Sequence, residues 1–364
     1  MTEKMVRFID IFIPISACNL QCHYCYIASS NRRNAPVPKL EHTPEFIGQA
    51  LTKERLGGTT LFNMCAWGET MLMPEIVDVT REILKQGHYV WIVTNGLIQE
   101  KFKEMIDTYS NDALERLAFK FSFHYLELKR LGLMNKFFET IKMVRDAGCS
   151  YTVELTSCDE LEQHIDEMRK IVKEQVGAEL QVTVPRDGSN KAFPLLSKHS
   201  EKEYYDIWKV FDSPMFDFKM SVWGQKRKEY CYAGAWSGLL NLSTGDLAAC
   251  YGTRLRQNIY RNIKKPIKFI PMGKHCCKAH CFNSHAFLAL GVIPEIDSCN
   301  YEQIRNRKCV DGTEWLNPRM KAFISQRLCD NHDEYGIAAR MMAEVKYQCI
   351  TKARFVYRKI KGLE

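Results

Sequence analysis

The chain has 364 residues, more than one average domain, and its apolar and charged fractions of 46% and 26% are those of an ordinary globular protein. These values exclude a largely disordered chain, and no apolar run approaches the roughly eighteen residues of a membrane span. The net charge of +8 favours an anionic partner without identifying one. Because the N-terminus has no apolar core ending in a cleavage site, we expect a cytoplasmic protein without a membrane partner.

Strands and helices alternate through the first half of the chain, and Thr43 and Asp159 are expected to cap two of the helices. The expected strands are 5–15, 59–64, 88–94, 117–123, 151–155 and 179–184, and the expected helices are 42–57, 74–87, 98–109, 135–148 and 160–176. Such alternation predicts a parallel sheet wound in one direction. We therefore expect the α/β class and a partial (β/α)6 TIM-type barrel, with the chemistry at the C-terminal ends of the strands.

The alternation stops after Pro185, which predicts four parts. They are a core over 1–190, a connecting segment over 191–220, a small cysteine-bearing domain over 221–300 and a helical extension over 301–364. The basic tail over 346–364 is interpreted as a solvated helix face rather than a nucleic-acid patch.

Three cysteines, Cys18, Cys22 and Cys25, follow the first expected strand within eight residues. Fifteen cysteines in a reducing compartment are not expected to form a disulfide framework, and clustered thiolates are typical ligands of zinc and iron-sulfur clusters. A structural zinc site closes with a fourth ligand, for which His23 is a candidate. A 4Fe-4S cluster on three cysteines instead leaves one iron open to another ligand.

The stretch "CNLQCHYCY" resembles the CxxxCxxC signature of the radical S-adenosylmethionine (SAM) superfamily, including the aromatic Tyr24 before the third cysteine. The resemblance covers about the first 190 residues. "MCAWGET" is similar to the family's Gly-Gly-Glu segment with Trp67 in place of the first glycine, "VTNGL" to its Thr-Asn-Gly stretch, and "FSFHY" supplies a serine after the fourth strand. Each motif falls directly after its expected strand.

By this resemblance a 4Fe-4S cluster on the three cysteines would bind SAM through its open iron. One electron would cleave SAM to methionine and a 5'-deoxyadenosyl radical, which abstracts hydrogen from the substrate. The residues that the resemblance and their positions place near SAM are Tyr24, Gly68, Glu69, Thr70, Asn95, Ser122 and Arg186. An electron donor of the flavodoxin or ferredoxin type is expected.

A second cysteine set begins with Cys231, Gly245 and Cys250, a spacing that resembles the start of the SPASM and twitch auxiliary-cluster domains. "GKHCCKAHC" adds further cysteines, too few in all for two clusters. We therefore expect a twitch-like domain with one auxiliary 4Fe-4S cluster, and structural zinc is the alternative. The expected ligands are Cys231, Cys250, Cys281 and either Cys276 or Cys277, with His275, His280 and His285 as possible substitutes because the closing pair is not the usual CxxC.

Cys65 and Cys158 follow the second and fifth expected strands, at the rim of the expected site. Either could donate a hydrogen atom to a substrate radical, and ordinary buried thiols are the alternative. His124 and Glu154 could face the barrel interior as core or SAM-positioning residues.

The resemblance leaves the reaction open. The early first strand and the single auxiliary cluster favour oxidation or epimerisation of a small-molecule or carbohydrate-type substrate. The alternatives are a maturase that modifies ribosomally made peptides and a non-catalytic iron-sulfur or zinc protein.

Overall fold

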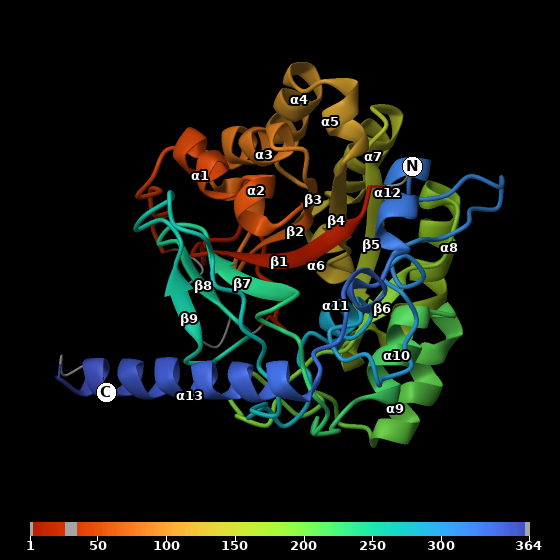
Figure 1. Cartoon of the computed structure of the whole chain (residues 1–364). Helices are drawn as coiled ribbons and strands as arrows, with labels where there is room; N and C mark the ends of the chain where they lie inside the picture. The colour runs from red at the N-terminus through yellow and green to blue at the C-terminus, as the bar shows by residue number, and fades with distance from the viewer. Residues whose placement is uncertain (1–2, 26–34, 361–364) are drawn as a thin grey trace.

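The computed structural model describes residues 3–25 and 35–360, and a parallel sheet forms the centre of this part of the chain (Figure 1). Its first six strands are β1 (Met5–Ile13), β2 (Thr59–Ala66), β3 (Tyr89–Thr94), β4 (Leu117–Ser122), β5 (Ser150–Thr156) and β6 (Gln181–Thr183). Each strand pairs in parallel with the one before it. The sheet is open, which confirms the α/β class and the partial barrel.

The outer face of the sheet is covered by the connecting helices. They are α1 (Pro44–Ala50), α2 (Lys53–Leu56), α3 (Ile76–Lys85), α4 (Gln99–Thr108), α5 (Asn111–Glu115), α6 (Tyr125–Leu131), α7 (Met134–Asp146) and α8 (Ile165–Val176), with 3-10 turns η2 (Thr70–Leu72) and η3 (Asp159–His164). Apolar side chains such as Ile11, Phe62 and Ile92 are fully buried beneath them. This burial explains why the strands contain so many β-branched and aromatic residues.

Two local predictions differ from the structure. The helix expected over 42–57 is two helices, because the Thr52 hydroxyl accepts from the Arg55 N–H at 3.4 Å and starts a new N-terminus. Thr43 does cap α1, by accepting from the Phe46 N–H at 3.3 Å. The predicted cap at Asp159 is wrong, since its carboxylate instead accepts from the Ser197 hydroxyl and the Lys198 N–H at 2.6 and 2.7 Å.

The sheet extends beyond β1 through residues of the second half of the chain. β7 (Ser237–Asn241) pairs in parallel with β1, and β8 (Asp246–Ala248) and β9 (Arg256–Asn258) follow it as antiparallel strands. The segment 191–220, expected as a connection, contains α9 (Glu201–Trp208), η4 (Lys209–Phe211) and α10 (Pro214–Ser221). It therefore contributes core residues, including the fully buried Trp208.

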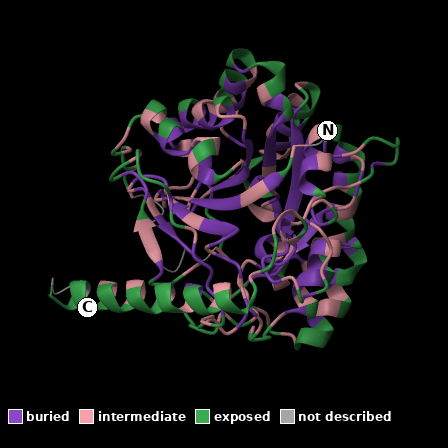
Figure 2. Ribbon diagram, viewed as in Figure 1, coloured by how far each residue is buried: buried purple, intermediate pink, exposed green. Residues whose placement is uncertain are grey.

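Beyond β9, the described helices are α11 (Ser284–Phe287), α12 (Pro318–Ile324), η5 (Leu328–Asn331) and α13 (Ile337–Ile360). The segment expected to be helical from 301 therefore has its first helix at Pro318. The chain beyond β9 covers the inner face of the sheet, where the Phe8 and Phe287 rings pack edge to face with centroids 5.6 Å apart. The strands are thus buried on both faces (Figure 2).

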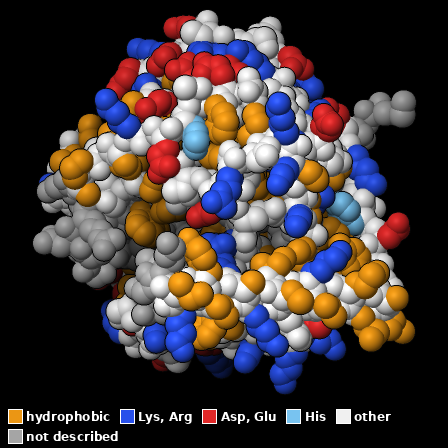
Figure 3. All heavy atoms as spheres, turned by 60° about the vertical axis from the view of Figure 1, so that its left-hand side comes forward, with side chains coloured by type: hydrophobic (Ala, Val, Ile, Leu, Met, Phe, Trp, Pro, Cys, Tyr) orange, Lys and Arg blue, Asp and Glu red, His pale blue; other side chains and the backbone are white. Residues whose placement is uncertain are grey.

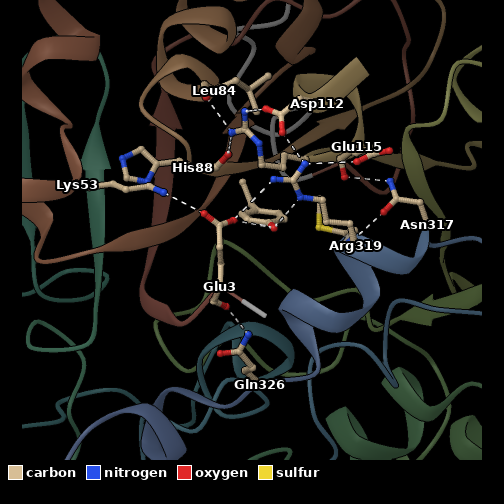
Figure 4. Close-up of polar contacts among 12 residues, drawn as sticks. Glu3, Lys53, Leu84, His88, Asp112, Glu115, Asn317, Arg319 and Gln326 are labelled. Carbon is tan, nitrogen blue, oxygen red and sulfur yellow. Dashed lines mark hydrogen bonds and ion pairs between the residues drawn. The ribbon is translucent and has the colours of Figure 1, made fainter. Parts of the chain in front are cut away.

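Arg319 of α12 fastens the C-terminal part to the N-terminal ends of the core strands (Figure 4). Its guanidinium lies 2.7 Å from the Asp112 carboxylate and 3.4 Å from that of Glu115, just before β4. Asn317 donates to the Glu115 carbonyl at 3.0 Å, and Gln326 donates to the Glu3 carbonyl at 2.8 Å. These contacts lie at the end of the sheet opposite the cysteine loop.

Helix α13 runs along the lower edge of the molecule in the view of Figure 1, and much of its surface is exposed (Figure 2). Apolar side chains lie along it between lysines and arginines, so the described part of the tail is more than a solvated polar face (Figure 3). The last four expected tail residues, 361–364, lie outside the described residues. Across residues 3–25 and 35–360, no helix combines the length and apolar character required to cross a bilayer.

Candidate functional site

The three cysteines of the first loop gather at the C-terminal end of β1. The Cys25 N–H donates to the Cys22 carbonyl at 3.3 Å, and this turn brings the later two thiols together. Cys22 is buried, whereas Cys18 and Cys25 are half-buried. Burial, and then the neighbouring Cys18 and Cys25 thiols, raise the pKa of Cys22 to about 12.

The donor set fits an iron-sulfur cluster better than a single zinc ion. Tetrahedral Zn–S bonds would hold the sulfurs roughly 3.8 Å apart. Among the described residues, only two sets of three metal-binding side chains converge within 4.8 Å, and Cys18, Cys22 and Cys25 are not one of them. His23, the candidate fourth zinc ligand, pairs instead with Glu160 at 3.1 Å. A cluster accommodates wider spacing because each thiolate binds its own iron.

The loop after β2 is seated directly on the cysteine loop. The Gly68 N–H donates to the Ile15 carbonyl at 2.8 Å, and the Glu69 N–H donates to the Ala17 carbonyl at 2.9 Å. A Cβ atom at position 68 would lie 1.9 Å from the Ala17 carbonyl oxygen, so only glycine allows this approach. The preceding Trp67, which replaces the family's first glycine, is exposed and packs on Phe12 with ring centroids 4.8 Å apart.

Glu69 joins the loops after β2 and β3 from a buried position. Its carboxylate accepts from the Thr94 hydroxyl at 2.6 Å, the Asn95 N–H at 2.7 Å and the Met71 N–H at 2.9 Å. Burial raises the pKa of Glu69, and the three hydrogen bonds oppose that rise. The carboxylate therefore holds the turns after β2 and β3 together. The next residue, Thr70, accepts from the Ala66 N–H at 3.1 Å and holds the same turn.

Asn95 and Tyr24 complete the connections among the strand ends. The Asn95 amide donates to Asn19 Oδ1 at 2.6 Å, and its nitrogen lies 3.9 Å from Cys18 Sγ. The Tyr24 hydroxyl lies 2.6 Å from Nδ1 of His124, which follows β4. Burial lowers the pKa of His124 to about 4, so this imidazole is neutral at pH 7.

Ser122 and Arg186 occupy other parts of the same edge. Ser122 is half-buried and sits opposite Glu154 in the register of β4 and β5. Arg186 is exposed after β6 and donates to the Phe282 carbonyl at 3.0 Å, next to the second cysteine set. The structure thus brings Tyr24, Gly68, Glu69, Thr70 and Asn95 together around the cysteine loop and places Arg186 on the C-terminal side.

The two candidate hydrogen-donor cysteines lie in different surroundings. Cys65 is on the inner face of β2, where burial raises its pKa to about 11 while the charge of Lys120 opposes the rise. Cys158 lies with His23 and Glu160, their ligand atoms all within 4.8 Å of one another. Cys65 therefore lies on the inner face of the sheet, and Cys158 lies beside His23 of the cysteine loop.

A polar layer crosses the inner face of the sheet, and of its members the sequence analysis named only Glu154, as a residue that could face the barrel interior. Asp10 on β1 accepts from Asn63 at 2.8 Å and from Asn283 at 3.1 Å, and it also accepts from the Tyr251 hydroxyl. On β4 and β5, Lys120 lies 3.8 Å from Glu154, which also pairs with the fully buried Arg305. The available signal was the single polar residue within otherwise apolar strands, as in "FIDIFI" and "LAFKFS".

All five cysteines of the second set line one cavity of about 50 Å³. They are Cys231, Cys250, Cys276, Cys277 and Cys281. The hairpin between β7 and β8 depends on Gly245, whose φ is +72° and where a Cβ atom would lie 2.2 Å from the Tyr260 ring.

Within this set, Cys276 is half-buried with the other thiols. Burial raises the pKa of Cys281, and the charges that add to the shift are those of Cys250, Cys231 and Cys276. Cys277 is exposed. Of the three histidines considered as substitutes, His275 turns to α13, where it contacts Glu344 at 2.6 Å. As at the first set, no three of these thiols are among the described groups that converge within 4.8 Å, so the wider spacing of an iron-sulfur cluster fits them better than a single zinc ion.

Comparison with known proteins agrees with this geometry. Residues 12–172 match the model of the Radical SAM superfamily. The structure of SuiB from Streptococcus suis bound to S-adenosylmethionine is similar at 13% identity and a TM-score of 0.50, over 71% of this chain and 64% of SuiB. Histidine-tagged anSMEcpe with bound AdoMet is similar at 14% identity and a TM-score of 0.50, over 96% and 94% of the two chains.

These likenesses show the fold alone, and the chain spans less than two thirds of the length of SuiB. A search of the curated proteins found no match. The family match and the site geometry agree on the same strands and the same cysteine loop. The chain therefore carries a radical SAM superfamily domain, which spans residues 12–172.

Proposed function

We propose that the protein is a radical SAM enzyme whose Cys18, Cys22 and Cys25 hold a 4Fe-4S cluster with one iron open to SAM. The observation that carries this proposal is the set of hydrogen bonds that joins the cysteine loop to the turn after β2 through Gly68 and Glu69. When bound, such a cluster supplies one electron to SAM and so yields the 5'-deoxyadenosyl radical that abstracts hydrogen from the substrate.

The chain's own residues would position SAM and support the cluster. Glu69 holds the turns after β2 and β3 in fixed relation, so the backbone groups that meet SAM are preorganised. The Leu20 N–H lies 3.5 Å from Cys18 Sγ, and the Asn95 amide approaches the same sulfur. Donors near a ligand sulfur favour its thiolate form and adjust the cluster's reduction potential.

The test is 5'-deoxyadenosine release by anaerobically reconstituted protein given dithionite and SAM. We expect the wild type to form 5'-deoxyadenosine and Cys22→Ala to form none. The proposal is wrong if the wild type with an intact cluster releases none. Because this chemistry needs an electron, we also propose a donor of the flavodoxin or ferredoxin type, whose acidic surface the net charge of +8 would suit.

We further propose one auxiliary 4Fe-4S cluster in a twitch-like domain, with Cys231, Cys250, Cys276 and Cys281 as ligands. These four thiols are half-buried and line one cavity, which supports the assignment. Reconstituted wild type should contain about eight iron atoms per chain and Cys276→Ala about four. Cys277→Ala is the matched control and should keep the wild-type content. Equal loss in both variants would contradict the assignment.

For the reaction, we propose oxidation or epimerisation of a small polar substrate at the inner face of the sheet. The enclosed polar layer supports this, since Lys120 and Glu154 side chains are only 11% and 9% exposed. Cys65 lies beside this layer and is a protonated thiol at pH 7, as a hydrogen-atom donor in epimerisation must be. Turnover in deuterated water should place deuterium in the product, and Cys65→Ala should stop it. A product without deuterium would indicate oxidation, and a peptide as the only substrate would favour the maturase alternative.

A further inference from the structure

An excess of positive charge lies between the inner face of the sheet and the C-terminal part of the chain. Lys120 comes from β4, Lys219 from α10 and Arg186 from the segment that follows β6. Helix α10, which carries Lys219, packs against β6 and against α11, which carries His285. Burial, and then the charges of Arg186 and Lys120, lower the pKa of Lys219 to about 7. Neighbouring positive charges repel one another and destabilise the protein unless an anion binds between them.

Lys219 is the most deeply placed of these cations. It is 5% exposed, and its Nζ donates to the Thr183 hydroxyl at 2.6 Å. No carboxylate in the described part of the chain forms an ion pair with it within 4.0 Å. A buried ammonium normally has a negative partner, so Lys219 lacks the counter-charge that its position demands.

The nearby carboxylates are already engaged by other groups. Glu154 contacts Arg305 and lies 3.8 Å from Lys120, so one carboxylate serves two cations. Asp10 accepts hydrogen bonds from Asn63, Asn283 and Tyr251. Neither carboxylate neutralises Lys219.

A further unpartnered polar atom lies in the same region. Nδ1 of His285, in α11, is buried and has no hydrogen-bond partner among the described residues. The charges of Lys219, Lys120 and Arg186 add to the effect of burial on this imidazole, so it stands beside the same cations. A neutral imidazole can donate one hydrogen bond to an anion bound there.

We propose that Lys219, Lys120, Arg186 and His285 bind an anionic group of the substrate, either a phosphate or a carboxylate. This inference rests on the proposed function, in that the bound group would anchor the substrate beside Cys65 and beneath the strand ends. Arg186 is exposed and would meet the anion at the entrance, and Lys219 would hold it inside. The substrate is then an acidic small molecule.

The test is thermal unfolding of the full chain titrated with sodium phosphate or sodium malonate at pH 7, against sodium chloride at equal ionic strength. We expect one of the two anions to raise the unfolding temperature in a saturable way, phosphate marking a phosphorylated substrate and malonate a carboxylate. Lys219→Met should raise the half-saturating concentration about tenfold or more, the loss expected for a charged hydrogen bond. Arg186→Gln changes an exposed residue that should not affect folding, and it should weaken binding severalfold.

Lys209→Met is the matched control, because Lys209 is an exposed lysine paired with Asp206 at 2.5 Å. It should respond as the wild type does. The proposal is overturned if neither anion protects more than chloride, or if all variants respond alike. It is also overturned if Lys219→Met loses SAM affinity to the same extent, since the cations would then serve the SAM carboxylate. None of these readouts requires SAM cleavage, so failure here is distinct from absence of 5'-deoxyadenosine.

Discussion

At the scale of single residues, the site depends on a glycine at position 68, where no side chain would fit. Gly68 lets the turn after β2 rest on the backbone of the cysteine loop, with hydrogen bonds of 2.8 and 2.9 Å on either side of the contact. Any Cβ there would meet the Ala17 carbonyl oxygen at 1.9 Å. The turn, and with it Glu69, would have to move.

We predict that Gly68→Ala lowers the rate of SAM cleavage about tenfold or more, because a displacement near 1 Å is enough to misalign a reactive complex. The measurement is 5'-deoxyadenosine formation together with iron content. Gly336→Ala is the control, since nothing lies within 4 Å of a Cβ at that position. Unchanged cleavage in Gly68→Ala would show that the close approach is not needed.

Lys219 makes stability depend on pH in a definite direction. In the folded protein, burial and then the charges of Arg186 and Lys120 lower the pKa of Lys219 to about 7. In the unfolded chain a lysine has its ordinary pKa of about 10.4. Between these values the unfolded chain binds more protons, so stability rises with pH, and the cost of burying the charge is complete below about pH 7.

Lys219→Met should therefore gain stability relative to wild type near pH 6, by about 4 kcal/mol, and the gain should shrink towards about pH 10. Thermal unfolding in chloride buffers across this range measures it. Lys209→Met should show no such trend. A difference that stays constant or grows with pH would contradict the assignment of a charged, unpaired Lys219.

At the scale of elements, the six core strands and most of their helices could be predicted, because each strand is apolar on both faces and ends at a turn. The polar layer could not, since a lone Asp10 or Lys120 in a strand resembles a solvent-facing residue. Its partners come from far along the chain: Tyr251 is 241 residues from Asp10, and Asn283 is 273. The split of the first helix at Thr52 was missed because the buried Ile47, Leu51 and Leu56 continue the apolar pattern across it.

The pair of Glu154 and Arg305 joins β5 to the segment before α12, and both side chains are almost fully buried. We predict that Glu154→Gln destabilises the protein by about 3–5 kcal/mol, because it leaves the Arg305 charge buried without its partner. The double variant Glu154→Gln/Arg305→Met should recover much of the loss. Urea unfolding measures both, and a double variant less stable than Glu154→Gln would refute this view of the pair.

At the scale of the whole molecule, the C-terminal part of the chain covers the inner face of the sheet. The helices that connect the core strands cover only the outer face. The C-terminal part is held at one end by Arg319 and beside the second cysteine set by His275, whose ring stacks on Tyr347 of α13 at 4.0 Å. Both sets of candidate ligand cysteines could be identified from their spacing in the sequence. It did not predict that β7 continues the core sheet, because the register of β1 with β7 arises only when strands more than two hundred residues apart pair.

The central claim is that three thiols at the end of β1 hold a cluster with an iron left for SAM. Electron paramagnetic resonance of the dithionite-reduced Cys281→Ala variant tests this most directly, because that variant should keep the core cluster and lose the auxiliary one. Adding SAM should change the spectrum of the reduced cluster, and Cys22→Ala/Cys281→Ala should give no cluster signal. An intact core cluster whose spectrum is identical with and without SAM would contradict the claim.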